Sequence, residues 1–177
     1  MILSLFKRKA SRISLRAVYG AIVAAARHPR FYAEWGVPDT VDGRYDMIIL
    51  HAVLVLDRLA SDGEAGRSFS QGLTDEVFAD MDRSLREMGV GDLSVGKKVR
   101  RMAEVFYGRA QAYTPLLRAD DTPTLAQAIY RNIYAGEGPE AGAGRIAAYA
   151  LEVRRYLQER PTAPILAGQI GFPDPSK

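Results

Sequence analysis

The chain contains no cysteine among its 177 residues, and this absence excludes several kinds of chemistry. Disulfide bridges, thiol catalysis, iron–sulfur clusters and cysteine-ligated zinc all require cysteine side chains. Histidine is nearly as scarce, since only His28 and His51 are present. Neither has a nucleophile or carboxylate at a spacing that indicates a catalytic set. We therefore predict a protein that is not an enzyme, with no catalytic residues, no metal, no cofactor and no small-molecule substrate.

Long hydrophobic runs are also missing. The longest, from Met47 to Leu56, has ten residues and includes His51, whereas a membrane-spanning helix needs about 18 apolar residues. A second run, residues 17–26, follows basic residues and superficially resembles a secretory signal. It is interrupted by Tyr19 and Gly20, and more basic residues follow it. We therefore predict neither a membrane span nor a cleaved signal.

Acidic residues are absent from the N-terminal segment before Glu34, where seven basic residues give a net charge of +7. The remaining 17 basic and 21 acidic residues leave the rest of the chain at −4. Such a basic arm is attracted to polyanions, either anionic lipid headgroups or ribosomal RNA, unless it is simply a solvated tail. The residues predicted to contact a membrane or ribosome are Lys7, Arg8, Lys9, Arg12 and Arg16.

The residues that are present predict helices almost throughout. Apolar residues make up 47% of the chain and charged residues 25%, as in an ordinary soluble domain. Apolar positions recur with helical spacing, and the predicted helices cover residues 14–26, 44–60, 73–88, 95–117, 122–135 and 145–159. The fold class is therefore all-α, a single-domain bundle of about six helices. We divide it into a basic arm with the first helix (1–30), a helical body (31–160) and an irregular tail (161–177).

Two of these helices carry clear burial signals. The helix 44–60 is apolar on nearly every side, which is typical of the centre of a bundle, although its β-branched residues leave a strand as the alternative. His51 within it is expected to be a core imidazole. In the helix 73–88 the buried stripe is predicted to contain Val77, Met81, Leu85 and Met88.

Glycine and proline mark the connections. Gly89 stands where a left-handed helix cap is expected, and Gly91 completes the turn, with Asp92 or Ser94 as the next N-cap. Gly108 is predicted to allow close helix packing. Thr122 before Pro123 indicates a helix start. The glycine-rich segment 136–144 is expected to be a flexible connector.

Two motifs suggest chemistry but fail on inspection. Residues 91–97 fit the G-x-x-x-x-G-K part of a phosphate-binding loop, yet Lys98 replaces the required Ser or Thr, and a helix precedes the motif instead of a strand. The second is an acidic cluster with no histidine at the spacing of helical di-metal sites. A charged surface explains it better. Its members are Asp75, Glu76, Asp80, Asp82 and Glu87.

Several segments carry a family resemblance. They are the sequences FY at 31–32, GVPDT at 36–40, GRYDM at 43–47, LH at 50–51, DMD at 80–82, REMGVGD at 86–92 and FYGR at 106–109. In order and spacing they resemble the ubiquinol–cytochrome c chaperone family. The segment 86–92 is the most distinctive of them. Together they span roughly residues 31–113.

The resemblance implies a helical assembly factor that escorts newly made cytochrome b into the cytochrome bc1 complex. It also implies a bacterial-type member at the cytoplasmic side of the inner membrane, with a small partner assembly factor in the mitochondrial relatives. Gly89, Gly91 and Gly108 would then be structural. The predicted partner-binding residues are Arg44, Asp80, Asp82, Arg86, Asp92, Lys97, Arg101, Tyr107 and Arg109.

Two alternatives stay open. Basic residues interleaved with tyrosine on the helix 95–117 also suit RNA, so a peripheral RNA- or ribosome-binding protein is the main alternative. An enzyme built around His51 and Asp46 is the other, and it requires His51 to line an open pocket.

Overall fold

Eight α-helices and no strand form the part of the chain that the computed structural model describes, residues 2–176, with side chains described from Arg12 onward. The all-α prediction is confirmed, and the strand alternative for residues 44–60 is wrong because this segment is helix α3. The helices are α1 (Ile2–Ala26), α2 (Pro29–Ala33), α3 (Val41–Leu59), α4 (Gly63–Glu87), α5 (Asp92–Ala119), α6 (Thr122–Ile133), α7 (Glu140–Gln158) and α8 (Thr162–Leu166).

Helix α3 is the centre of the molecule, as its apolar sequence predicts. It packs against α1, α4, α5, α6 and α7, and from Tyr45 to Leu59 its side chains are almost all buried. Thr40 caps it, since the hydroxyl of Thr40 accepts a hydrogen bond from the Gly43 N–H at 3.1 Å. No helix within residues 2–176 is long and apolar enough to cross a membrane. Most hydrophobic side chains of α3 are buried in the core of the molecule.

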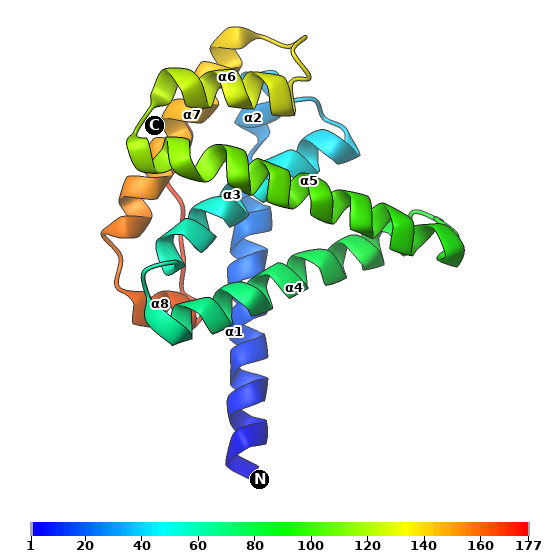
Figure 1. The fold of residues 1–177 in the computed structure, drawn as a ribbon, viewed down its shortest axis with the longest axis vertical. Coiled ribbons are helices and arrows are strands. Elements are labelled where there is room, and N and C mark those ends of the chain that lie inside the picture. The colour runs from blue at the N-terminus through cyan, green and yellow to red at the C-terminus, as the bar shows by residue number, and fades with distance from the viewer. Residues whose placement is uncertain (1, 177) are drawn as a thin grey trace.

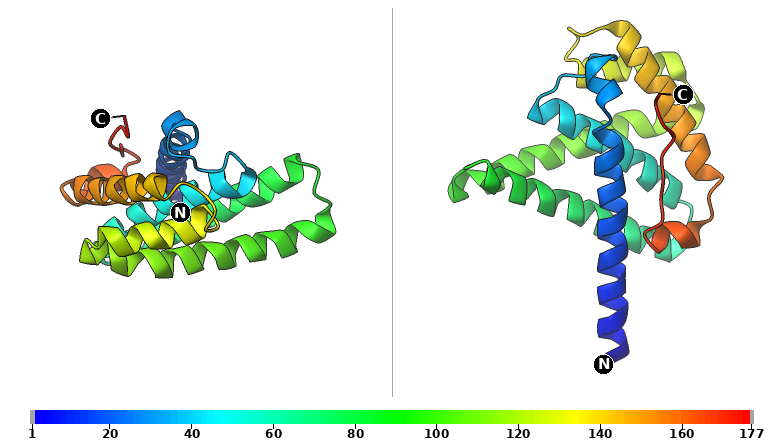
Figure 2. Two further views of the ribbon diagram at one scale, coloured as in Figure 1. Left: turned by 90° about the horizontal axis from the view of Figure 1, so that it is seen from above. Right: turned by 180° about the vertical axis from the view of Figure 1, so that it is seen from behind.

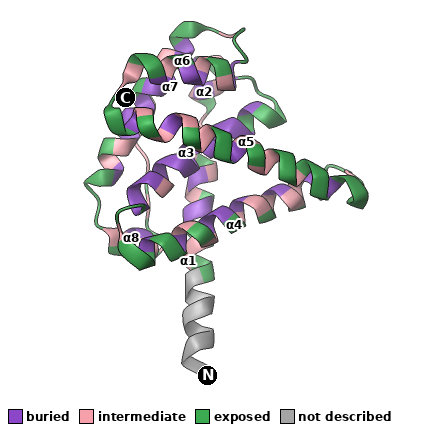
Figure 3. Ribbon diagram, viewed as in Figure 1, coloured by how far each residue is buried: buried purple, intermediate pink, exposed green. Residues whose placement is uncertain are grey.

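Helices α4 and α5 form a long hairpin that extends away from the other helices (Figure 1). Near its base α5 packs on α3 and α6, while α6 and α7 lie side by side at the other end of the molecule. Toward the turn between α4 and α5 most residues are exposed (Figure 3). The hairpin is therefore the part of the described chain that reaches farthest from the common core on this side.

The C-terminal segment runs back across the molecule after α8, beside α1 and α7, and ends near α2 (Figure 2, right). Arg30 of α2 donates a hydrogen bond to the Pro175 carbonyl at 3.1 Å. The ring of Phe172 meets the ring of His51 edge-on, with 5.4 Å between centroids. These contacts hold the segment against the core.

Several predicted helix ends differ from the observed ones. Helix α4 begins at Gly63, ten residues before the predicted start, and α7 begins at Glu140, inside the predicted connector. The predicted irregular tail contains the short helix α8. Helix α6 is capped by Asp121, whose carboxylate accepts a hydrogen bond from the Thr124 N–H, and not by Thr122.

Candidate protein-binding surface

Three of the predicted partner-binding residues meet near the turn of the α4–α5 hairpin. The Arg86 guanidinium of α4 contacts the Asp82 carboxylate at 2.6 Å, and it also pairs with Asp92 at the start of α5. The hydrogen bond from Arg86 lowers the pKa of Asp82 from its usual value. Arg86 and Asp92 are exposed and Asp82 is partly exposed, so the network joins the two helices at the surface and leaves its charges open to a partner.

Three more are exposed residues of α5. Lys97 and Arg101 are one helical turn apart, whereas Tyr107, with 57% of its surface exposed, lies on a neighbouring side of the helix, about 80° around the axis from Lys97. The Tyr107 ring packs against Phe78 of α4 and against Phe106, with centroids 6.0 and 5.5 Å apart. The aromatic ring is thus held in place while much of it faces solvent. Tyrosine and arginine in such positions dominate the binding energy of many protein interfaces.

Two predicted partner-binding residues make internal contacts instead. Asp80 accepts a hydrogen bond from the Tyr19 hydroxyl at 2.7 Å and pairs with Arg83, which ties α1 to α4. Arg109 donates to Asp46 of α3 at 3.1 Å and to the Asn132 side chain and carbonyl of α6 at 3.0 and 2.9 Å. Burial nevertheless raises the pKa of the Asp46 carboxyl to about 6.

Arg44 lies apart from the hairpin. It stands on the first turn of α3, pairs with Asp39 at 2.6 Å and lines a groove of about 620 Å³. The groove's other lining residues come from the turn after α1, from α2 and from the loop before α3, and none from α4 or α5. The structure therefore does not bring Arg44 together with the other predicted residues.

The three predicted turn glycines differ in conformation. Gly89 has φ +80°, a left-handed value that strains any residue with a side chain. The Gly89 and Val90 N–H groups donate to the carbonyls of Arg86 and Leu85, each at 3.0 Å, which is the hydrogen-bond pattern of a Schellman cap. Gly91 is the N-cap of α5 with φ −63°, so Asp92 and Ser94 are not the cap. Gly108 has no neighbour within 4 Å of an added Cβ.

Two exposed apolar residues at the turn were missed by the sequence analysis. Val77, Met81 and Leu85 are buried as predicted, but Met88 ends the helix and is 53% exposed. Leu93, on the first turn of α5, is 101% exposed. The periodicity placed Met88 in the buried stripe because it could not show that the hairpin projects beyond the core there. Leu93 gave no signal in the sequence.

The basic arm is described only in part. Arg12 is exposed, and Arg16 contacts Glu76 of α4 at 3.5 Å with its side chain 60% exposed. The side chains of Lys7, Arg8 and Lys9 lie outside the described residues. Contact of this arm with a membrane or ribosome remains a prediction.

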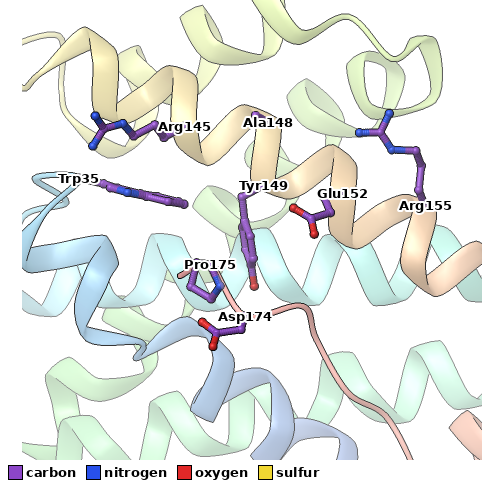
Figure 4. Close-up of a pocket in the computed structure, with 8 residues that line it drawn as sticks. All are labelled: Trp35, Arg145, Ala148, Tyr149, Glu152, Arg155, Asp174 and Pro175. Atoms are coloured by element: carbon purple, nitrogen blue, oxygen red, sulfur yellow. The ribbon is translucent and has the colours of Figure 1, made fainter. Parts of the chain in front are cut away.

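A shallow pocket of about 420 Å³ lies on the other side of the core (Figure 4). Its lining residues are Trp35, Arg145, Ala148, Tyr149, Glu152, Arg155, Asp174 and Pro175. His51 lies beneath it, fully buried, with Nε2 3.1 Å from the Tyr149 hydroxyl and Nδ1 2.8 Å from the Met47 carbonyl. His51 lines neither of the two pockets, so the condition for an enzyme built around it is not met.

Comparisons with known proteins agree on one family. A family model described as "Ubiquinol-cytochrome C chaperone" matches residues 33–172. The crystal structure of the Cbp3 homologue from Brucella abortus is 42% identical, with a TM-score of 0.88 over 100% of this chain and 99% of that chain. Among curated proteins, ubiquinol-cytochrome-c reductase complex assembly factor 1 of Xenopus laevis is 25% identical over 69% of this chain, and its Homo sapiens counterpart is 24% identical over 70%. The matches span 60% and 41% of those two relatives.

Proposed function

The chain belongs to the ubiquinol–cytochrome c chaperone family, and from this membership we propose that it is a non-enzymatic assembly chaperone of the cytochrome bc1 complex. Its client on this proposal is newly made cytochrome b. The names of these two curated relatives support the assignment to this complex, since both are called assembly factors of ubiquinol–cytochrome c reductase. Because the chain matches only part of those relatives, their full activity and their partners are extended to it as part of the proposal.

The observation that carries the proposed site is the exposed aromatic and basic face of α5. Tyr107 is fixed by Phe78 and Phe106 and still exposes more than half of its surface, and the exposed Lys97 and Arg101 lie on a neighbouring side of the same helix. A fixed side chain loses little conformational entropy when a partner covers it, so this face is prepared for binding. Helices of a membrane protein need an apolar contact before they insert, and the Tyr107 region offers one with charges around it.

The Asp82–Arg86–Asp92 network extends this surface across both helices of the hairpin. Its opposite charges can exchange their partners for those of a client, which favours specific pairing and orientation over affinity. We place the work of the chaperone at the cytoplasmic face of a bacterial inner membrane, where a client leaves the ribosome. A small partner assembly factor would have the separate groove beside Arg44 available to it.

Pull-down of the tagged chain from membranes of its own host tests this function. The surface variant is Arg101→Glu combined with Tyr107→Ala, and the matched control is Arg145→Glu, an exposed arginine of α7 away from the hairpin. We expect cytochrome b with the wild type and with the control, and at least tenfold less with the surface variant.

Other results separate the two parts of the proposal. Equal recovery of cytochrome b by all three proteins would leave the function standing and move the site elsewhere. Recovery of ribosomes or RNA without cytochrome b would favour the RNA-binding alternative, for which four neighbouring basic residues of α5 are the specific observation: Lys97, Lys98, Arg100 and Arg101.

A further inference from the structure

The turn of the α4–α5 hairpin presents apolar side chains with nothing beside them to cover them. Leu93 is 101% exposed and Met88 is 53% exposed, and they flank the turn on its two sides. The turn is the outermost part of the hairpin in both the front view and the view from above (Figures 1 and 2). An exposed leucine at the end of a projection gains from any apolar environment that can surround it.

Positive charge is concentrated directly behind these two residues on the α5 side of the turn, whereas the α4 side ends with the exposed Glu87 next to Met88. Between Met88 and Arg101 the chain has a single acidic residue, Asp92, and it is already paired with Arg86. The same interval has four basic residues, all exposed: Lys97, Lys98, Arg100 and Arg101. With a rise of 1.5 Å per residue, they lie about 6–12 Å along α5 from Leu93.

The hairpin thus has two apolar side chains at its tip and basic side chains of α5 behind them, and this order matches the layers of a lipid surface. Apolar side chains of interfacial proteins reach about 5–10 Å into the boundary between headgroups and acyl chains, where basic residues pair with anionic headgroups. We propose that the tip of the hairpin inserts into an anionic membrane surface. Met88 and Leu93 enter the acyl boundary, and the four basic residues of α5 contact headgroup phosphates.

The shape of the tip favours lipid over RNA or protein. RNA bases stack on aromatic rings, and residues 88–101 contain none. A protein partner is bound through a groove or a broad face, whereas the turn is a narrow projection closed by the Gly89 cap. A lipid surface needs no groove, because its acyl chains rearrange around an inserted side chain.

The inference does not depend on the proposed client. A hairpin anchored by its tip would hold the exposed face of α5 close to the membrane, which suits a chaperone for a membrane protein. Vesicle binding by the purified chain involves no client, so failure of this inference leaves the proposed function untouched.

Vesicle flotation of the full chain provides the first test. The probes are vesicles of phosphatidylcholine alone and of phosphatidylcholine with phosphatidylglycerol in equal parts. Leu93→Asp is the tip variant, and Val41→Asp is its control, since Val41 is another exposed large apolar residue (54%), on α3 away from the tip. We expect binding to the anionic vesicles only, reduced about tenfold or more by Leu93→Asp and unchanged by Val41→Asp.

The absence of cysteine allows a direct second test. Leu93→Cys and Val41→Cys each introduce one thiol for an environment-sensitive nitrobenzoxadiazole dye. With anionic vesicles, the dye at position 93 should shift its emission to the blue and become protected from aqueous quenchers, whereas the dye at 41 should not.

Three results would overturn the proposal. They are anionic-vesicle binding that Leu93→Asp leaves intact, an unshifted dye at position 93, and binding to RNA with none to vesicles. If Leu93→Asp binds anionic vesicles as the wild type does and Arg12→Glu/Arg16→Glu does not, the membrane contact belongs to the basic arm instead.

Discussion

His51 shows how a polar residue is accommodated at the centre of this core. The Met47 carbonyl can only accept a hydrogen bond, so His51 carries its proton on Nδ1, and Nε2 accepts from the Tyr149 hydroxyl. Both ring nitrogens of the neutral imidazole are thereby satisfied. Burial lowers the pKa of His51 to about 4, because it removes the charged form from water. The sequence prediction of a core imidazole is confirmed.

This arrangement predicts a pH dependence of stability. The unfolded chain takes up a proton on His51 near pH 6.5, and the folded chain only near pH 4. Between these values the unfolded chain binds more protons, so the free energy of unfolding falls as the pH decreases. Urea unfolding of wild type and His51→Gln at pH 7 and pH 4.5 should show the wild type losing about 2 kcal/mol more than the variant.

The comparison with His51→Gln is needed because the titration of Asp46 changes the free energy of unfolding in the opposite direction. Its pKa is raised to about 6, so the folded chain binds this proton first, and stability falls as the pH rises from about 4 to about 6. Both proteins share this contribution, and it cancels in their difference. Parallel pH profiles for the two proteins would contradict a buried neutral His51.

Arg109 makes internal contacts that the sequence did not predict. The family resemblance placed it at the partner surface, but its guanidinium joins α5 to Asp46 of α3 and to Asn132 of α6. Its spacing along α5 could not show this, because Asp46 is 63 residues away in the sequence. A tertiary ion pair of this kind has no local signature.

Replacing Arg109 by Met should therefore destabilise the fold. Asp46 would remain buried with no cationic partner among the described residues, which costs about 3 kcal/mol. Arg118→Met is the control, because Arg118 is half-exposed and its partner Asp57 keeps Arg154 at 3.0 Å. We expect about 1 kcal/mol or less for the control in urea unfolding at pH 7. Similar losses for the two variants would show that Arg109 contributes no more than a surface pair.

At the scale of elements, the hairpin turn depends on one glycine. Gly89→Ala places a side chain at φ +80° and should lower the free energy of unfolding by about 1 kcal/mol, measured by urea unfolding. Gly91→Ala is the matched control two residues away, with φ −63° and open space around the added methyl. It should change stability little. An equal loss in both variants would contradict the assignment of the cap to Gly89.

The same scale explains the helix ends that the sequence did not predict. Residues 63–72 contain three glycines and lack an apolar period, so no helix was predicted there, and residues 136–144 were predicted to be a flexible connector. In the structure, a Cβ at Gly66 would lie 2.4 Å from the Leu59 carbonyl oxygen, and one at Gly142 would lie 1.9 Å from that of Trp35. These glycines permit close packing between segments. A high glycine content was interpreted as a sign of flexibility, whereas at these two positions it reflects tertiary contact. Where apolar periodicity is strong, as in α3 and α5, the predicted helices were found.

At the scale of the whole molecule, the fold class and the family were predictable and the arrangement was not. The all-α class followed from periodicity, and the family followed from segments such as residues 86–92. The projection of the hairpin depends on how α4 and α5 pack on α3, so it cannot be predicted from any one segment of the sequence. Asp82, Arg86 and Asp92 come together because they are near in sequence, whereas Arg44 lies at a separate groove.

We propose that this chain is needed to build the cytochrome bc1 complex and that it acts through exposed side chains of α5. Ubiquinol–cytochrome c reductase activity, measured in membranes of the host after deletion of the gene and return of one version of it, tests both parts. We expect activity to be lost on deletion, restored by the wild type and by Arg145→Glu, and not restored by Arg101→Glu/Tyr107→Ala at equal protein levels. Undiminished activity in the deletion strain would show that the chain is not needed for the complex.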